Sequence, residues 1–113
     1  MSFKLMSHQF WIVDEEYDFT ALDTRIYFLI VDISLHENSQ DFQIKNSLIC
    51  IFAECSDYEL RCSREKLMEA GLITYEYSYS KRTGVYKINN LFEGEELLNP
   101  YAFDKFLDDE EIF

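Results

Sequence analysis

The chain has 113 residues, 48% of them apolar and 17% aromatic, and 22 acidic against 10 basic residues give a net charge of −12. This length fits one domain with a modest core, and the composition excludes a wholly disordered chain. No apolar run reaches the roughly 18 residues that a membrane span needs, and no signal peptide opens the sequence, so we expect a cytoplasmic protein without a membrane partner.

The charge is distributed unevenly along the chain. Residues 45–87 hold seven basic and six acidic residues (net +1), residues 1–44 hold two and eight (−6), and residues 88–113 hold one and eight (−7). The acid therefore flanks a nearly neutral centre. The three cysteines have no paired spacing and are expected to be free thiols. No motif for a metal, a cofactor or a catalytic nucleophile is found, so we do not expect an enzyme.

Residues 1–19 are weakly patterned and are predicted to form an N-terminal extension. Phe10 to Val13 is a short apolar run that fits either a strand or the start of a helix. Residues 14–18 are mostly acidic and are predicted to form a solvated connector.

The first clearly predicted helix begins at Thr20. Thr20 and Asp23 have the spacing of a capping box, and apolar residues recur at helical spacing over residues 22–33. This helix should end around Leu35. Three further apolar residues lie off the main stripe and predict a second buried side, covered by flanking segments or by another subunit. They are Tyr27, Phe28 and Val31.

A short strand and a short helix are expected next. Apolar and polar residues alternate over residues 42–45, which predicts the strand, and Asn46 can cap a helix that continues to Ala53. That helix is so apolar that we expect its neighbours to cover it on both sides.

Residues 56–92 carry the strongest local signals. Ser56 and Glu59 predict a second capping box, and Gly71 predicts a left-handed helix end. Alternation from residue 73 to residue 79 predicts a strand, residues 80–84 a basic-tipped loop, and residues 85–88 a returning strand that Leu91 and Phe92 finish. Beyond it, Tyr101, Phe103, Phe106 and Leu107 could line one face of a last short helix.

This order of elements resembles winged helix-turn-helix domains over about residues 20–90, and we assign residues 20–92 to one such domain. Residues 20–33 resemble the first helix of such domains in phage and plasmid replication proteins of Gram-positive bacteria, such as the N-terminal domains of DnaD-like initiators and the RepL-type plasmid proteins. Residues 67–73 resemble the end of their recognition helix, and residues 85–89 resemble the return strand of their wing. The resemblance implies an α+β fold of three helices plus a β-hairpin wing, followed by an acidic C-terminal segment, residues 93–113.

The resemblance also implies a DNA-binding surface, because such proteins place the recognition helix in the major groove and the wing on the backbone. We therefore expect a homodimer that binds duplex DNA in replication initiation or in transcriptional regulation of a mobile element. The candidate DNA-binding residues are Tyr58, Arg61, Arg64, Lys66, Lys81 and Arg82.

Each of these side chains also fits a structural role. Arg61 has the spacing to pair with Asp57 or Glu65, Lys66 can pair with Glu69, and Arg64 can lie along the edge of the core. The tyrosine stripe fits either base stacking or packing against another surface. It consists of Tyr75, Tyr77 and Tyr79, with Tyr86 across from them.

The alternative function is a winged-helix protein-interaction module. Its acidic flanks would bind a basic host or replication protein, or mimic DNA to inhibit one. A single positive strip formed by Arg61, Lys81 and Arg82 would favour DNA binding, whereas acids paired with them would favour the interaction module. The end of the chain, acids followed by Ile112 and Phe113, resembles the acidic tip of bacterial single-stranded DNA-binding proteins, although it also fits a solvated tail.

Overall fold

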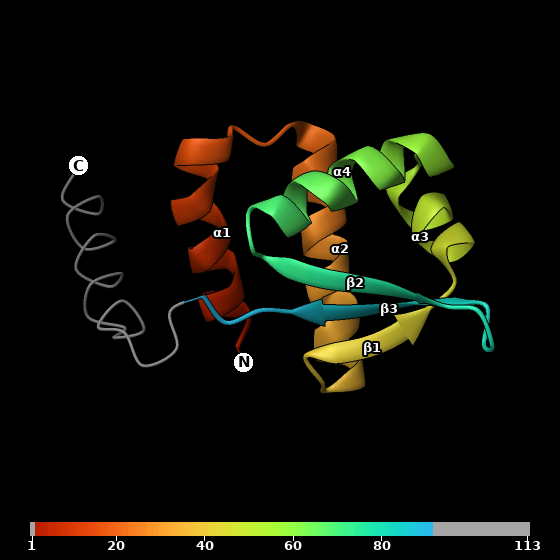
Figure 1. Ribbon diagram of the computed structural model, residues 1–113. Coiled ribbons are helices and arrows are strands. Elements are labelled where there is room, and N and C mark those ends of the chain that lie inside the picture. Colours follow the sequence, from red (N-terminus) through yellow and green to blue (C-terminus); the bar gives the residue numbers. More distant parts are fainter. Residues whose placement is uncertain (1, 92–113) are drawn as a thin grey trace, which may run out of the picture.

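The computed structural model describes residues 2–91, which form four helices and a three-stranded antiparallel sheet (Figure 1). The predicted α+β class is confirmed, and the arrangement is compatible with a winged helix. The helices are α1 (Phe3–Tyr17), α2 (Ala21–Glu37), α3 (Asn46–Ala53) and α4 (Asp57–Glu69). The strands are β1 (Asp41–Ile44), β2 (Ile73–Ser78) and β3 (Thr83–Ile88).

Strand β3 lies in the middle of the sheet, between β1 and β2. The β2–β3 hairpin closes where Ser78 pairs with Thr83, and β1 runs antiparallel to β3 so that Ile44 faces Gly84. Because strand side chains alternate between faces, Phe42 and Tyr86 lie on the same face, which packs against the helices. Helix α2 passes behind the sheet and α4 lies above β2 in Figure 1.

The two capping boxes predicted from sequence are both present. The Thr20 hydroxyl accepts from the backbone N–H of Asp23, whose carboxylate accepts from the Thr20 N–H in return. Ser56 and Glu59 make the same reciprocal pair at the start of α4. Gly71 has a φ of 81°, the left-handed conformation predicted for it, and directs the chain from α4 into β2.

The N-terminal segment differs most from the expectation. Residues 3–17 form one continuous helix, so the apolar run at 10–13 is helical, and residues 14–17 are its last turn rather than a connector. Helix α1 packs on the second apolar side of α2, where Tyr27 and Val31 are fully buried. Burial of that side by a flanking segment is therefore confirmed.

Gln9 ties α1 to the end of the sheet. Its buried side-chain amide donates to the Asn89 carbonyl oxygen (2.7 Å) and to the Tyr27 hydroxyl (3.2 Å), and its Oε1 accepts from the backbone N–H of Leu91 (3.1 Å). Strand β3 ends at Ile88, so the prediction that Leu91 continues the strand is wrong. The chain turns towards α1 because Gln9 satisfies the backbone groups that a longer strand would have paired.

Helix α3 also differs from the prediction. Ile49 and Ala53 are buried, but Ile51 is 67% exposed and Phe52 is 63% exposed, so the expectation that neighbours cover both sides is wrong. Asn46 is the first residue of the helix rather than its cap, and its side chain is directed towards the sheet instead.

No helix in the described part of the chain is long and apolar enough to cross a lipid bilayer. The predictions for Phe92, for a last helix around residues 101–107 and for the acidic segment 93–113 fall outside the described residues.

Candidate nucleic-acid interface

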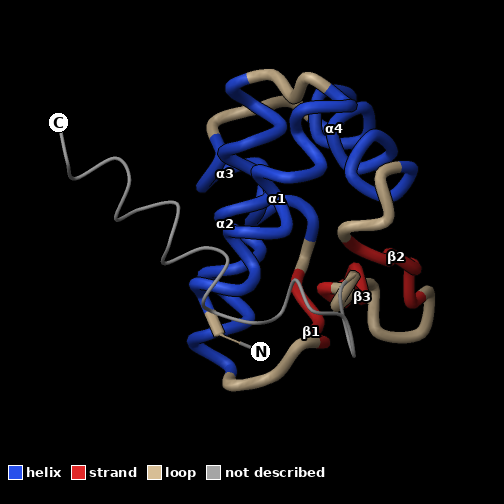
Figure 2. Tube along the Cα trace, turned by 90° about the vertical axis from the view of Figure 1, so that its left-hand side faces the viewer, coloured by secondary structure: helices blue, strands red, loops and turns tan. Residues whose placement is uncertain are grey.

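Helix α4 and the β2–β3 hairpin lie on the same side of the molecule in both views (Figures 1 and 2). Helix α4 starts beside the end of α3 and runs towards the start of β2, and β2 then runs back beneath it. The beginning of α4, the end of β1 and the tip of the hairpin all lie towards the right-hand side of Figure 1, where α3 lies between the beginning of α4 and the hairpin tip.

Tyr58 and Arg61 are exposed on α4. Tyr58 is 71% exposed, and within residues 2–91 the Arg61 side chain forms neither an ion pair nor a hydrogen bond. The predicted alternative, a salt bridge from Arg61 to Asp57 or Glu65, is therefore absent from this part of the chain. Asp57 instead accepts a hydrogen bond from the Cys50 thiol, which ties α4 to α3.

Arg64, by contrast, is used inside the protein. Its guanidinium lies 3.7 Å from the centroid of the Tyr75 ring and donates to the Tyr86 hydroxyl (3.2 Å). That hydroxyl donates to Asn46 Oδ1 (2.6 Å), and Asn46 Nδ2 donates to the Tyr75 hydroxyl (2.7 Å). Burial raises the pKa of Tyr86 to about 12, so the hydroxyl keeps its proton and remains a donor. This network joins α3, α4 and the hairpin.

Gly84 lies beneath the network and leaves room for it. A Cβ at this position would lie 2.7 Å from Asn46 Oδ1 and 2.8 Å from ring carbons of both Tyr75 and Tyr86. These distances are shorter than any ordinary contact, so the two tyrosines close over the backbone only because residue 84 has no side chain.

Lys66 is also engaged within the protein, but not with the predicted Glu69. Its ammonium group lies 3.1 Å from the Asp23 carboxylate and donates to the Asp18 carbonyl oxygen (3.2 Å), which joins α4 to the start of α2. Burial acts to raise the pKa of Asp23, but hydrogen bonds from Ser63, Thr20 and Lys66 outweigh it and hold that pKa below its usual value.

The hairpin tip is residues 79–82, because Thr83 and Gly84, predicted to be loop, already pair in β3. Lys81 and Arg82 are exposed, and in the described structure neither side chain has an ionic partner. Arg82 has a φ of 55°, a left-handed conformation that favours glycine or asparagine.

Sequence reasoning missed Lys45 as a member of this site. Lys45 is exposed and directly follows Ile44, which pairs with Gly84 two residues after Arg82. Strand pairing thus brings Lys45 close to the hairpin tip, although 36 residues separate it from Lys81 along the chain. The signal available in the sequence was the predicted strand ending at a lysine, but the pairing of that strand with β3 was not evident.

The four tyrosines divide between two roles. Tyr86 is fully buried and Tyr75 half-buried in the Arg64 network, as the packing interpretation predicted. Tyr77 continues the same face of β2 and is 37% exposed, and Tyr79, the first residue after the strand, is 85% exposed. Their rings meet edge to face, with centroids 4.8 Å apart.

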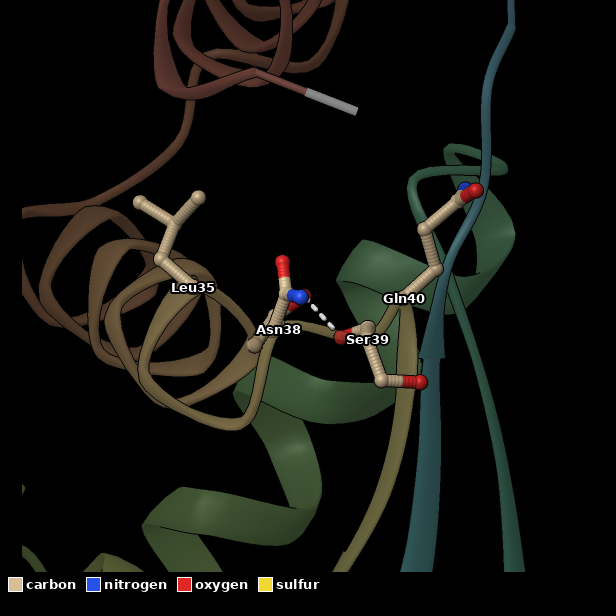
Figure 3. Close-up of a pocket in the computed structure, with 5 residues that line it drawn as sticks. Leu35, Asn38, Ser39 and Gln40 are labelled. Carbon is tan, nitrogen blue, oxygen red and sulfur yellow. Dashed lines mark hydrogen bonds between the residues drawn. The ribbon is translucent and has the colours of Figure 1, made fainter.

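A separate surface pocket lies where α2 joins β1 (Figure 3). Ser34, Leu35, Asn38, Ser39 and Gln40 line it. The Ser34 hydroxyl donates to the Ser39 carbonyl oxygen, and the Gln40 amide donates to the Ile88 carbonyl oxygen, so these polar groups hold the turn together. Among residues 2–91, no three His, Cys, Asp or Glu side chains converge as metal ligands would.

Comparison with known proteins yielded no match to a family model, a curated protein or a solved structure.

Proposed function

We propose that this chain is a winged-helix DNA-binding protein that acts as a homodimer in replication initiation or transcriptional regulation of a mobile element. Helix α4 is the recognition helix in this proposal, and the β2–β3 hairpin is the wing. The observation that carries it is a set of basic side chains on α4, after β1 and at the hairpin tip that are exposed and have no ionic partner within residues 2–91. They are Lys45, Arg61, Lys81 and Arg82.

The four side chains have separate roles in this proposal. Arg61, with Tyr58 beside it, reaches base edges from α4, because an unpaired guanidinium can bind guanine through two hydrogen bonds. Lys45, Lys81 and Arg82 hold the phosphate backbone. Arg64 and Lys66 fix the positions of the hairpin and of α2 relative to α4, since Arg64 contacts Tyr75 and Tyr86 and Lys66 pairs with Asp23.

The backbone of Arg82 supports this assignment. A left-handed conformation costs a residue with a Cβ about 1 kcal/mol relative to glycine. An arginine at this costly backbone position is consistent with a role for its charge in binding rather than in folding. Replacing it with glycine should therefore remove the charge while leaving the turn as stable as before, or more stable.

Dimerisation is proposed through an aromatic surface on α1 and α2. Phe28 on α2 is half-buried, and its ring centroid lies 6.1 Å from that of Phe3 and 5.9 Å from that of Trp11. Phe3 is 53% exposed and Trp11 is 50% exposed. Leu35, which is also exposed, extends this surface along α2. Exposed apolar patches of this kind commonly mark protein contacts. Trp11→Ser should shift the protein towards monomer in sedimentation velocity, and an unchanged sedimentation coefficient would place the dimer contact elsewhere.

The direct test is fluorescence anisotropy of a labelled duplex at low and moderate salt. We expect binding that weakens steeply with salt, because phosphate neutralisation releases counterions. Arg61→Ala and Arg82→Gly should each weaken binding, whereas Lys87→Ala, which removes an exposed charge from the opposite face of the sheet, should not. No binding at low salt, or equal loss in all three variants, would refute the proposal.

The second candidate is the protein-interaction module, and the exposed face of α3 favours it. Leu48, Ile51 and Phe52 present apolar surface next to the acidic Glu54 and Asp57, which suits a partner helix with one apolar and one basic face. Phe52→Ser would abolish binding to such a partner and leave duplex binding unchanged. If the protein does not bind duplex at low salt, this candidate becomes the first to test.

A further inference from the structure

The helix-facing side of β2 becomes progressively more exposed towards the hairpin tip. Ile73 is buried beneath α4, Tyr75 is half-buried under Arg64 and Tyr77 is one-third exposed, and Tyr79, in the turn after the strand ends at Ser78, is almost wholly exposed. Two strand residues span about 6.6 Å, so Tyr77 lies past the part of the sheet that Arg64 covers, and Tyr79 follows it at the start of the turn. The pair therefore forms an aromatic step beside the basic tip.

The two rings of the step contact each other. Tyr79 meets Tyr77 edge to face with centroids 4.8 Å apart, and strand pairing of Tyr77 with Gly84 anchors the base of the step in the sheet. Lys81 and Arg82 follow within three residues, so an exposed ring and two cations lie on the same short loop.

This combination suits unpaired bases better than a duplex. In a duplex the faces of the bases are stacked on one another, and only their edges are open in the grooves. An exposed aromatic ring flanked by cations instead offers a stacking surface for a base and charge for the adjoining phosphates, which is how proteins bind single strands without sequence preference.

We infer that the hairpin tip binds unpaired nucleic acid, with a base stacked on Tyr79, Tyr77 holding that ring in place, and Lys81 and Arg82 neutralising the adjacent phosphates. The inference rests on the proposed function for nucleic-acid binding as such and extends it from duplex to single strands. A protein that binds both forms through neighbouring surfaces is suited to a junction between duplex and opened strands.

The test compares the binding of a labelled 15-nucleotide oligo-dT and of a duplex of equal length to the chain of residues 1–113. Tyr79→Ala should weaken oligo-dT binding about 5- to 150-fold, since stacking of one base is worth about 1–3 kcal/mol. Tyr79→Phe should bind as the parent does, because the ring and not the hydroxyl makes the contact. Thr74→Ala, which changes an exposed side chain on the opposite face of β2, is the control and should change neither affinity.

A spectroscopic variant reports stacking directly. Trp11 is the single tryptophan of the chain, so Trp11→Phe combined with Tyr79→Trp places the one indole at the proposed site. Its fluorescence should be quenched when oligo-dT binds.

Four outcomes would overturn the inference. Unchanged oligo-dT affinity in Tyr79→Ala, together with no quenching in the Tyr79→Trp variant, would remove the stacking role. In that case, duplex binding that still depends on Arg61 would leave the proposed function intact. Equal weakening of oligo-dT and duplex would show that the ring contacts paired DNA. A change of oligomeric state in Tyr79→Ala without any change in DNA affinity would assign the step to a protein contact. Absence of binding to either nucleic acid would remove both proposals.

Discussion

Gly84→Ala tests whether the hairpin is held against α3 and α4 as described. The added methyl group would lie 2.7 Å from Asn46 Oδ1 and 2.8 Å from ring carbons of Tyr75 and Tyr86, so these groups must move apart. Overpacking of this kind costs about 1–3 kcal/mol. Weakening the hydrogen bond from Tyr86 to Asn46 adds about 1 kcal/mol.

The expected loss of unfolding free energy is therefore about 2–4 kcal/mol. With a urea dependence of about 2 kcal/mol per molar, the midpoint of unfolding should fall by about 1–2 M. Circular dichroism during a urea titration measures this shift. Thr83→Ala, at the neighbouring position of the same strand, removes only a 3.4 Å contact to Gln43 and should change the midpoint little.

A double variant identifies the cause. Asn46→Ala removes the atom nearest to the new methyl group, so Gly84→Ala should cost at least about 0.5 kcal/mol less in that background than in the parent. A loss below about 0.5 kcal/mol for Gly84→Ala alone, the range of ordinary surface changes, would refute the packing argument. An equal loss in both backgrounds would show that Asn46 is not the obstructing group.

Three further predictions concern other parts of the fold. Because the pKa of Asp23 is lowered on folding, its contribution to stability is present above the unfolded pKa of about 4 and is lost as the pH falls through the lower folded value. The urea midpoint of Asp23→Asn should therefore vary less between about pH 2 and 5 than that of Asp32→Asn, which changes an exposed position on the same helix. Parallel curves for the two variants would contradict this prediction. Iodoacetamide at about pH 8 should modify the exposed Cys62 well before Cys50, because burial and contact with Asp57 raise the pKa of Cys50 to about 12, so mass spectrometry showing equal rates would disprove the assignment. Gln9→Leu should lower the unfolding free energy by about 1–3 kcal/mol by leaving buried backbone groups without partners, and an unchanged urea midpoint would show that the Gln9 contacts contribute nothing.

The parts of the fold that were predicted from the sequence are those that depend on interactions between residues close together in the chain. The capping boxes at Thr20 and Ser56, and the left-handed Gly71, each depend on residues within about four positions of one another, so a single sequence reveals them. The strands of the hairpin were found for the same reason, because their alternation is local and their pairing partner is adjacent in sequence.

The missed features depend on distant partners. Helix α1 was not recognised because Gln9, a polar residue in the middle of its buried face, interrupts the apolar pattern, and the groups that satisfy it are 18 and about 80 residues away. Arg64 and Lys66 looked as available as Arg61, since only tertiary structure brings Tyr86 and Asp23 to them. The exposure of Ile51 could not be inferred either, because an apolar helix is usually buried.

The number of exposed basic residues limits how tightly one copy of the chain can bind DNA. Of the seven basic residues in the central segment, Arg64 and Lys66 are used internally and Lys87 lies on the outer face of the sheet, which leaves four at the proposed interface. Three of these four, Lys45, Lys81 and Arg82, are assigned to phosphates. Three phosphate contacts imply a slope of about −2.7 for the logarithm of the duplex binding constant against that of the salt concentration, and two paired copies imply about −5.4. Because a net charge of −12 per chain repels DNA at long range, three phosphate contacts should give weak binding, whereas six on one duplex can compensate. A slope near −5.4 that falls to about half in Trp11→Ser would therefore tie DNA affinity to the aromatic surface of α1 and α2, and a slope near −2.7 in both proteins would mean that each copy binds alone.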